Sequence, residues 1–265
     1  MATPLKNMYD PFFFEQLCPV LREVLPSFDE RRFIYRVFDT RWPDLTLTER
    51  VRHIAYALHV SMPPHFPVAA DLIVALSSKL MGMGAKPQQF PYIFLQDYLG
   101  RFGSNYHEEA MRAIGEVTRL VSGEFAVRNF LIAEPEKTFA WLRRWSFSEG
   151  EAVRRLASEG CRPRLPWAKV VRSLTENPTP ILPILDNLKA DESLYVRRSV
   201  ANNLNDIAKD HPDVVLRLAG RWDRTNPETN WIVKRGCRTL LRRGVVEVNT
   251  LQKKGGLLLA TLPLD

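Results

Sequence analysis

The sequence predicts an all-helical fold built from repeated helix pairs. Amphipathic segments with helical periodicity are common, and proline interrupts them. Alternating β-branched runs and Asn-Gly turns, which are typical of strands and hairpins, are essentially missing. In the second half a Val-Arg or Val-Lys dipeptide recurs at separations of 26, 43 and 37 residues. The last two separations fit helix-pair repeats of about 40 residues.

Four helices are expected in the first half. The segment 48–60 is amphipathic and ends before Pro63 and Pro64, because proline disfavours helix in the residue before it and cannot continue one. The other three are expected at 67–80, 92–101 and 106–121.

In the second half, each dipeptide is expected to begin the second helix of a pair, with its valine facing inward. The dipeptides are Val127-Arg128, Val153-Arg154, Val196-Arg197 and Val233-Lys234. The segments 181–188 and 214–222 are expected to supply first helices. Stacked pairs bury a continuous core and curve into a concave surface. We therefore expect one repeat domain over 1–245, with a helical part at about 1–120 and a basic part at about 121–245. The tail 246–265 loses the pattern and is interpreted as a cap or a poorly ordered end.

The positive charge is confined to the second half. Residues 1–120 contain 13 Lys+Arg and 13 Asp+Glu, whereas residues 121–265 contain 24 and 17, which accounts for the formal net charge of +7. A one-sided basic surface attracts nucleic acid or anionic lipid. A charge excess that merely keeps the protein in solution is the alternative interpretation.

Composition limits the setting in which the chain works. No apolar stretch approaches the length of a membrane span, and the N-terminus does not resemble a secretory signal. Three widely separated cysteines argue for a reduced, cytoplasmic compartment and against a disulfide framework or a zinc cluster. The spacing of His53, His59 and His65 does not align them on a helix, so we expect no metal site.

Two runs combine cations and carboxylates on helical faces. In EAVRRLASEGCRPRLPW (151–167), Arg155 and Glu159 are four residues apart and therefore neighbours on one face. In YVRRSVANNLNDIAKDHPD (195–213), Arg198, Asn202 and Asp206 follow at the same spacing. The opposite face of the second run is an apolar stripe of Val196, Val200, Leu204 and Ile207. Such polar faces suit a surface that holds an anionic polymer and performs chemistry on it.

Each of these polar residues also has an ordinary structural explanation. Glu124 follows Ser122 and Gly123, and a carboxylate in a first helical turn is favoured by the helix dipole. Glu159 precedes Gly160, where a helix should end, and could simply pair with Arg155.

Aromatic and amide residues leave alternatives too. Trp167 ends a proline-bracketed loop and could be a core residue or could stack on a base. The asparagines around Asp206 could form a solvent face, mark an early helix end, or accompany a functional carboxylate. The remaining tryptophans of the second half are expected in the core: Trp141, Trp145, Trp222 and Trp231.

Four segments together resemble a known family. They are EFAVRNFL (124–131), VRRLASEGCRPRLPW (153–167), SLYVRRSVANNLNDIAKDHPD (193–213) and NWIVKRGCRTLLRRG (230–244). They resemble the AlkC branch of the HEAT-repeat DNA glycosylases, the AlkC/AlkD superfamily. The resemblance covers about residues 5–245 and is most specific over 151–213.

The resemblance implies a HEAT-like helical-repeat solenoid of bacterial origin with a concave basic surface. It also implies excision of alkylated, cationic bases such as 3-methyladenine from duplex DNA, without metal or nucleotide cofactor. Some family members carry a C-terminal immunoglobulin-like domain, which we do not expect in this chain. We expect a monomer whose partner is alkylated duplex DNA, with no membrane association.

Carried onto this sequence, the catalytic carboxylates fall on Glu124 and Asp206, with Glu159 as a third. The base-contacting aromatic falls on Trp167, and Arg155 falls in the cleft. We expect DNA contacts from the basic residues Arg154, Arg162, Arg164, Arg197, Arg198, Lys234 and Arg235. The alternative is a non-catalytic HEAT-repeat scaffold that binds DNA or a protein.

Overall fold

The computed structural model describes residues 4–168 and 170–243. These residues form fifteen α-helices and three short 3-10 helices, and none of them lies in a strand. The predicted all-helical class is therefore confirmed. The chain divides into two compact units, Met1–Thr138 and Phe139–Asp265. Our division of a single repeat domain near residue 120 stays a prediction, and the tail 246–265 lies outside the described residues.

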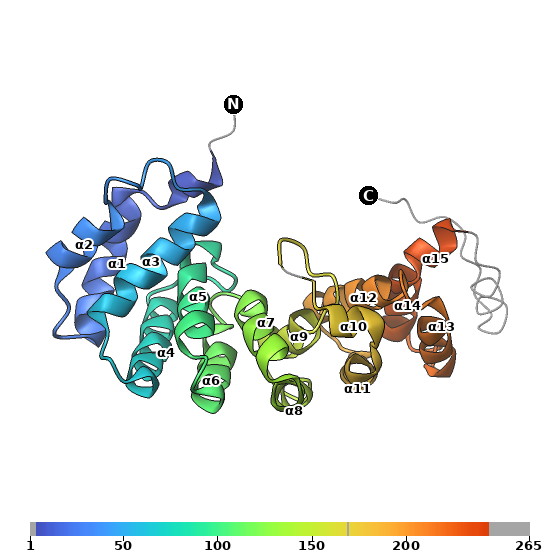
Figure 1. The fold of residues 1–265 in the computed structure, drawn as a ribbon. Coiled ribbons are helices and arrows are strands. Elements are labelled where there is room, and N and C mark those ends of the chain that lie inside the picture. Colours follow the sequence, from blue (N-terminus) through green and yellow to red (C-terminus); the bar gives the residue numbers. More distant parts are fainter. Residues whose placement is uncertain (1–3, 169, 244–265) are drawn as a thin grey trace. The chain divides into compact units, whose positions relative to one another are not determined.

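The N-terminal unit alternates helices between two layers. Its elements are η1 (Leu5–Met8), α1 (Pro11–Val24), α2 (Glu30–Val37), α3 (Leu47–Ser61), α4 (Phe66–Gly82), η2 (Phe90–Tyr92), α5 (Ile93–Phe102), α6 (His107–Val117) and α7 (Glu124–Ala133). Within it α3 packs on α5 and α5 on α7, while α4 packs on α6 (Figure 1). Helices that alternate along the chain are thus neighbours in space, as expected for stacked pairs.

Local sequence signals explain where several of these helices begin. Asp10 caps α1 by accepting from the backbone N–H of Phe13, and Pro11 occupies the first helical position. Thr46 and Glu49 form a reciprocal capping box at the start of α3. Helix α3 ends at Ser61, just ahead of Pro63, as predicted. Helices α1 and α2 were not anticipated from periodicity, although the Asp-Pro pair is a recognisable start signal.

An aromatic cluster forms the core of the first three helices. The ring of Phe14 contacts those of Phe33, Phe38 and Trp42 in edge-on geometry at centroid distances of 6.1, 5.3 and 6.4 Å. Edge-to-face pairs at these distances are favourable beyond the area that they bury. Arg50 lies beneath Trp42 and donates to the backbone carbonyls of Lys6 and Trp42.

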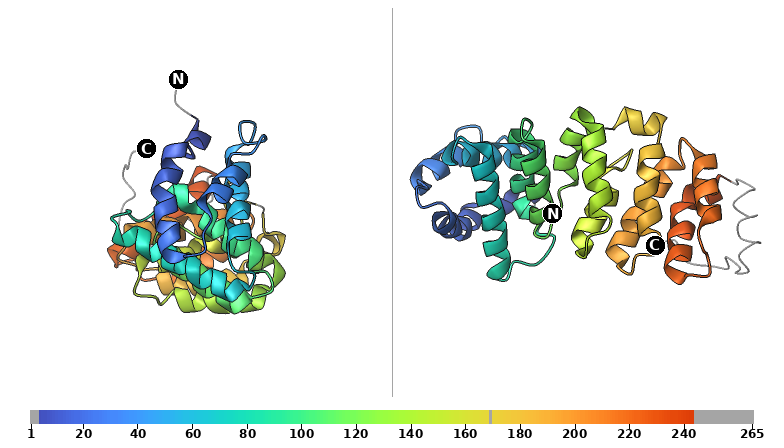
Figure 2. Two further views of the ribbon diagram at one scale, coloured as in Figure 1. Left: turned by 90° about the vertical axis from the view of Figure 1, so that its left-hand side faces the viewer. Right: turned by 90° about the horizontal axis from the view of Figure 1, so that it is seen from below.

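The C-terminal unit repeats the alternation. Helix α8 (Pro135–Trp145) crosses the boundary between the units in sequence, and the following elements are α9 (Glu151–Gly160), α10 (Arg172–Glu176), η3 (Thr179–Ile181), α11 (Leu182–Leu188), α12 (Leu194–Ile207), α13 (Pro212–Arg221), α14 (Pro227–Gly236) and α15 (Arg238–Arg242). Helix α12 packs against α9 on one side and α14 on the other. The yellow to orange-red helices of this unit lie side by side in Figure 2.

The Val-basic dipeptides locate three of four helix starts. The valines at 127, 153 and 196 lie within the first four residues of α7, α9 and α12, and all are buried as predicted. Val233 is also buried, but its placement at a helix start was wrong. Helix α14 begins at Pro227, where the Asn226 side chain caps it, so the dipeptide falls near its end.

Two of the four tryptophans expected in the core are only partly buried. Trp145 and Trp222 are buried, as predicted. Trp141 and Trp231 are half-buried and lie beside arginines, with the guanidinium of Arg144 4.0 Å from the Trp141 ring centroid and that of Arg235 5.6 Å from Trp231. An indole on a helix flank can satisfy both an apolar core and a cation.

No single helix among the described residues is long and apolar enough to cross a membrane. Helices α3 and α4 would qualify only as a pair, by length and composition, and the chain bends by 116° between them.

Candidate active site

Helices α9 and α12 each carry a candidate carboxylate one residue before their last. Glu159 precedes Gly160, which ends α9, and Asp206 precedes Ile207, which ends α12. The predicted apolar stripe of α12 is confirmed, because all four of its members are buried. The helical pattern placed Asp206 on the opposite, polar face, yet Asp206 is only 3% exposed and Glu159 only 5%. Buried carboxylates require partners, because desolvating an unpaired charge is costly.

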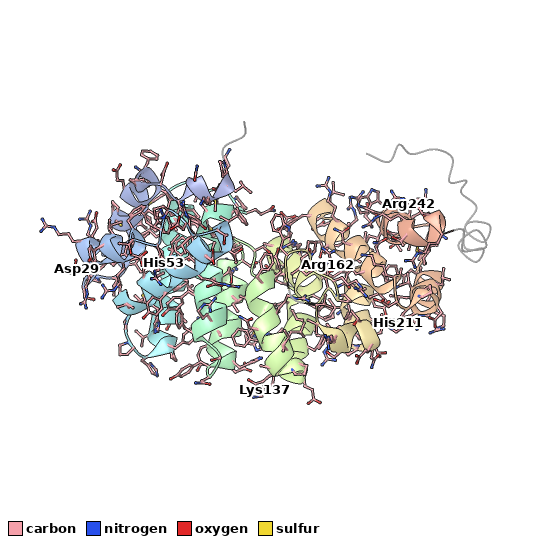
Figure 3. The ribbon with its side chains drawn as sticks, turned by 45° about the horizontal axis from the view of Figure 1, so that its top comes forward. Asp29, His53, Lys137, Arg162, His211 and Arg242 are labelled. Carbon is pink, nitrogen blue, oxygen red and sulfur yellow. The ribbon has the colours of Figure 1, made fainter. Side chains whose placement is uncertain are left out.

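Arg162, in the loop after α9, is the partner of both carboxylates. Its Nε donates to Asp206 Oδ2 at 2.9 Å, and its Nη1 donates to Glu159 Oε1 at 2.6 Å. Figure 3 labels Arg162 among the side chains of the C-terminal unit. Burial lowers the pKa of this guanidinium, but Glu159 and Asp206 outweigh that effect, so the pKa of Arg162 is raised. The arginine therefore remains a fixed cation between two carboxylates.

Further donors complete the surroundings of the two carboxylates. Ser199 Oγ donates to Glu159 Oε2 at 2.6 Å, and Arg155 Nη2 lies 3.5 Å from Glu159 Oε1. The Arg155–Glu159 pair predicted from their spacing is thus confirmed. Lys209 Nζ donates to Asp206 Oδ1 at 3.2 Å from a side chain that is 39% exposed. Glu159 is enclosed by buried donors, whereas one oxygen of Asp206 faces a partly exposed lysine.

Two of the three asparagines around Asp206, Asn203 and Asn205, are buried inside α12, so they form neither a solvent face nor an early helix end, whereas Asn202 is half-buried. Asn203 is fully buried and donates to the Ser158 carbonyl of α9 at 2.8 Å. Asn205 is also buried and accepts from Thr239 Oγ1 of α15 at 2.8 Å. These amides connect α12 to its neighbours and hold the backbone that carries Asp206, a role that the helix-propensity argument did not anticipate.

Trp167 is the largest exposed apolar side chain of this region. It is 87% exposed, which excludes the core interpretation. Its φ is +63°, a backbone conformation that non-glycine residues rarely adopt. The loop that presents the indole also carries Arg162, which is buried, and Arg164, which is partly exposed. An exposed indole ring is suited to stacking on a base or on a cation.

Arg154 and Arg197, two of the arginines expected to contact DNA, donate to backbone carbonyls of their own unit. Arg154 forms a bidentate pair with Asp191 at 2.6 and 3.1 Å and also donates to the carbonyls of Ser148 and Glu149. Arg197 donates from Nη1 to the carbonyls of Asp191 and Glu192. Both arginines therefore tie helix starts to the preceding loop. Their contact with DNA stays a prediction.

The other basic candidates are nearer to solvent. Arg164 pairs with Asp210 at 2.9 and 3.1 Å, and both side chains are partly exposed. Arg198 and Arg235 are exposed, and Lys234 is half-buried. These four side chains can reach a ligand without unfolding of the helices that carry them, although Arg164 would exchange its carboxylate partner for the ligand.

Glu124 belongs to the N-terminal unit, where it is the first residue of α7. Gly123 is the N-cap of the helix, and the Glu124 side chain is half-buried. Its negative charge complements the positive end of the helix dipole. The structure therefore brings Glu159 and Asp206 together, and it describes Glu124 within its own unit.

Several residues of this site were not identified from the sequence. Ser199 lies three residues after Val196 on α12, and Lys209 follows the helix end. The i to i+3 spacing of Asp206 and Lys209 was a usable signal. The Arg162–Asp206 contact spans 44 residues and has no local signature. Among residues 4–168 and 170–243, no group of three or more His, Cys, Asp or Glu side chains could hold a metal ion.

Comparison with known proteins identifies similar chains that cover most of the sequence. The Pseudomonas fluorescens alkylpurine DNA glycosylase AlkC, solved bound to DNA containing an abasic site analog, matches with a TM-score of 0.88 and 36% identity. This match covers 95% of the present chain and 69% of that one. The uncharacterized protein YhaZ of Bacillus subtilis (strain 168) is 41% identical over 240 residues, or 91% of the chain. The chain spans 65% of the length of YhaZ.

AlkD2 from Streptococcus mutans matches at 22% identity and a TM-score of 0.40. No family model matches the chain.

The helical repeats and the similarity to AlkC define the class of protein as the HEAT-like AlkC/AlkD superfamily. Within that superfamily the chain belongs to the AlkC branch. The resemblance inferred from the four sequence segments is confirmed.

Proposed function

We propose that this protein is a DNA glycosylase that excises alkylated, cationic bases such as 3-methyladenine from duplex DNA. The observation that carries the proposal is the buried Asp206, fixed by Arg162, in a chain so similar to an alkylpurine DNA glycosylase. A carboxylate kept at this depth by a dedicated arginine is costly for a protein that needs only a scaffold.

The chemistry requires little from the enzyme beyond negative charge and a held water. A purine methylated at N3 or N7 carries a positive charge, so it leaves as a neutral base when the C1′–N bond breaks and takes the bonding electrons. The sugar becomes oxocarbenium-like, and carboxylates beside it stabilise that cation. Water then adds to C1′ and gives its proton to a carboxylate. We assign these roles to Asp206 and to Glu124.

The remaining candidates would bind the DNA. Arg155 and Trp167 are proposed to lie against the lesion, with the exposed indole stacking on a base or on the cationic ring. Arg164, Arg198, Lys234 and Arg235 are proposed to contact phosphates, which position a duplex without reading its sequence. Arg154, Arg162 and Arg197 also belong to the proposed DNA-facing set, although each has intramolecular partners.

The test is release of free methylated base from methylated duplex DNA, measured chromatographically with and without EDTA. We expect release of 3-methyladenine at the same rate in both conditions, because no step of the proposal uses a metal. A protein that binds the methylated duplex but releases no methylated base would be the non-catalytic scaffold instead.

A further inference from the structure

Four buried side chains of the C-terminal unit are joined in a single line of hydrogen bonds. Ser199 donates to one oxygen of Glu159, Arg162 donates to the other, and the same guanidinium donates to Asp206. The distances are 2.6, 2.6 and 2.9 Å. The line runs from the middle of α12, across the end of α9, and back to the end of α12.

The two carboxylates of this line differ in how exposed their hydrogen-bond donors are. Glu159 accepts through both oxygens from buried donors, and Arg155 faces the oxygen that Arg162 already uses. Asp206 uses one oxygen for Arg162 and the other for Lys209, whose side chain is 39% exposed. A cationic sugar can replace an exposed lysine at Asp206. At Glu159 it would have to displace buried donors.

We propose that Glu159 does not contact the sugar and is instead a positioning residue that holds Arg162 against Asp206. This inference rests on the proposed glycosylase function and changes the role expected for Glu159 from catalytic to positioning. Ser199 extends the line, because its hydroxyl fixes the Glu159 oxygen that Arg162 does not reach.

The physical advantage is a carboxylate held in one place before the substrate arrives. Transition-state stabilisation depends on charges that need not reorganise during the reaction. A guanidinium is planar and rigid, so clamping it between two acceptors fixes its direction. Without Glu159, Arg162 would retain Asp206 as a partner but would lose the contact that orients its plane.

A double-mutant cycle distinguishes positioning from direct contact. The variants are Glu159→Gln, Asp206→Asn and their combination, measured by single-turnover release of 3-methyladenine at saturating enzyme. In the otherwise unchanged protein, Glu159→Gln should slow base release about tenfold. In the Asp206→Asn background it should slow base release by less than about twofold, because its effect depends on the Asp206 carboxylate. Duplex affinity should be unchanged in every variant, since none of these groups needs to touch phosphate.

Two further variants keep the test independent of folding defects. Ser199→Ala removes the hydroxyl at the end of the line. It should reduce the rate of base release by a smaller factor than Glu159→Gln, and this reduction should also be absent when Asp206→Asn is present. Arg50→Gln is the control, because Arg50 is a buried arginine that donates to backbone carbonyls far from this line in sequence. It should lower the melting temperature without changing the single-turnover rate.

The outcomes separate this inference from the proposed function. If Glu159→Gln reduces the rate of base release by the same factor whether or not Asp206→Asn is also present, Glu159 acts on the substrate directly and the inference is wrong. The glycosylase function would still stand. If the unchanged protein releases no base, the proposed function fails and the inference fails with it.

Discussion

Each of the two units is stabilised internally by a different kind of contact. In the N-terminal unit, aromatic rings such as Phe14, Phe33 and Trp42 form the core, and ion pairs such as Arg112–Asp71 lie between side chains that are about half exposed. In the C-terminal unit, ion pairs such as Arg162–Asp206 join side chains that are less than 10% exposed.

The difference shows which unit contains contacts that stability alone does not explain. An aromatic core is stable and chemically inert. Buried ion pairs stabilise a fold poorly, since desolvation cancels much of the attraction. The basic charge excess is also confined to the second half of the sequence. Apart from Glu124, the N-terminal unit thus has the contacts of a support, and the buried ion pairs of the C-terminal unit fit the catalytic role proposed for Asp206. Each prediction below tests that contrast.

The largest effect is expected from removing an aromatic ring of the support. Phe14→Ala should lower the free energy of unfolding by about 3–5 kcal/mol, because it leaves a cavity among four rings. Urea denaturation measures this loss. The neighbouring Phe12→Ala is the control, since Phe12 is exposed and should cost less than about 0.5 kcal/mol. Equal losses for both variants would contradict the description of this core.

The next effect concerns chemistry in the other unit. Asp206→Asn should slow base release about a hundred- to a thousand-fold, because a neutral amide replaces the anion beside the developing sugar cation. It should also lower the melting temperature, since Arg162 loses one of its two charged partners. Single-turnover excision at saturating enzyme is the measurement, with Asp213→Asn on the exposed surface of α13 as control. A rate within about threefold of the unchanged protein would transfer the role to Glu124.

A smaller effect is expected when an ion pair inside the C-terminal unit is compared with an ion pair inside the N-terminal unit. Arg154→Ala should cost about 3 kcal/mol of unfolding free energy, because it leaves Asp191 buried without its bidentate partner. Arg112→Ala removes an exposed pair of the N-terminal unit and should cost less than about 1 kcal/mol. Thermal or urea unfolding of both variants tests the contrast directly, and the reverse order would refute it.

The smallest effect concerns the grip on DNA. Arg164→Ala should reduce the slope of log affinity against log salt concentration by about 0.9, as expected for the loss of one phosphate contact. Arg217→Ala, which removes an exposed arginine of α13, should leave the slope unchanged. Titrations of an unmodified duplex at several salt concentrations measure both. An unchanged slope for Arg164→Ala would place this loop away from the phosphates.

The sequence predicted the helices well because their signals are local. Proline at 63 ends α3, and inward valines mark α7, α9 and α12. The dipeptide at Val233 was misleading, since the capping asparagine at 226 determines the start of α14. Proline and capping residues therefore located the ends of these helices more reliably than the repeated dipeptide did.

The site was predicted less completely because its contacts are long-range. Spacing alone indicated Arg155 beside Glu159, and that pair is present. Helical periodicity also placed Asp206 opposite the apolar stripe. The residues near Asp206 in sequence do not indicate that Arg162, 44 residues earlier, donates to its carboxylate. A pattern along one helix predicts a face, and only the packed structure shows what covers that face.

The left-handed backbone of Trp167 has a consequence for recognition. An 87% exposed side chain has few packing contacts, so the backbone dihedral angles of the loop set the direction in which the side chain leaves it. For the stacking role proposed for the ring, the cost of this backbone conformation is met during folding and not during association, which is a form of preorganisation. Glycine at this position would relax the loop, whereas alanine would keep most of its constraint and remove only the ring. The two substitutions therefore separate the entropy of the loop from the contact energy of the indole.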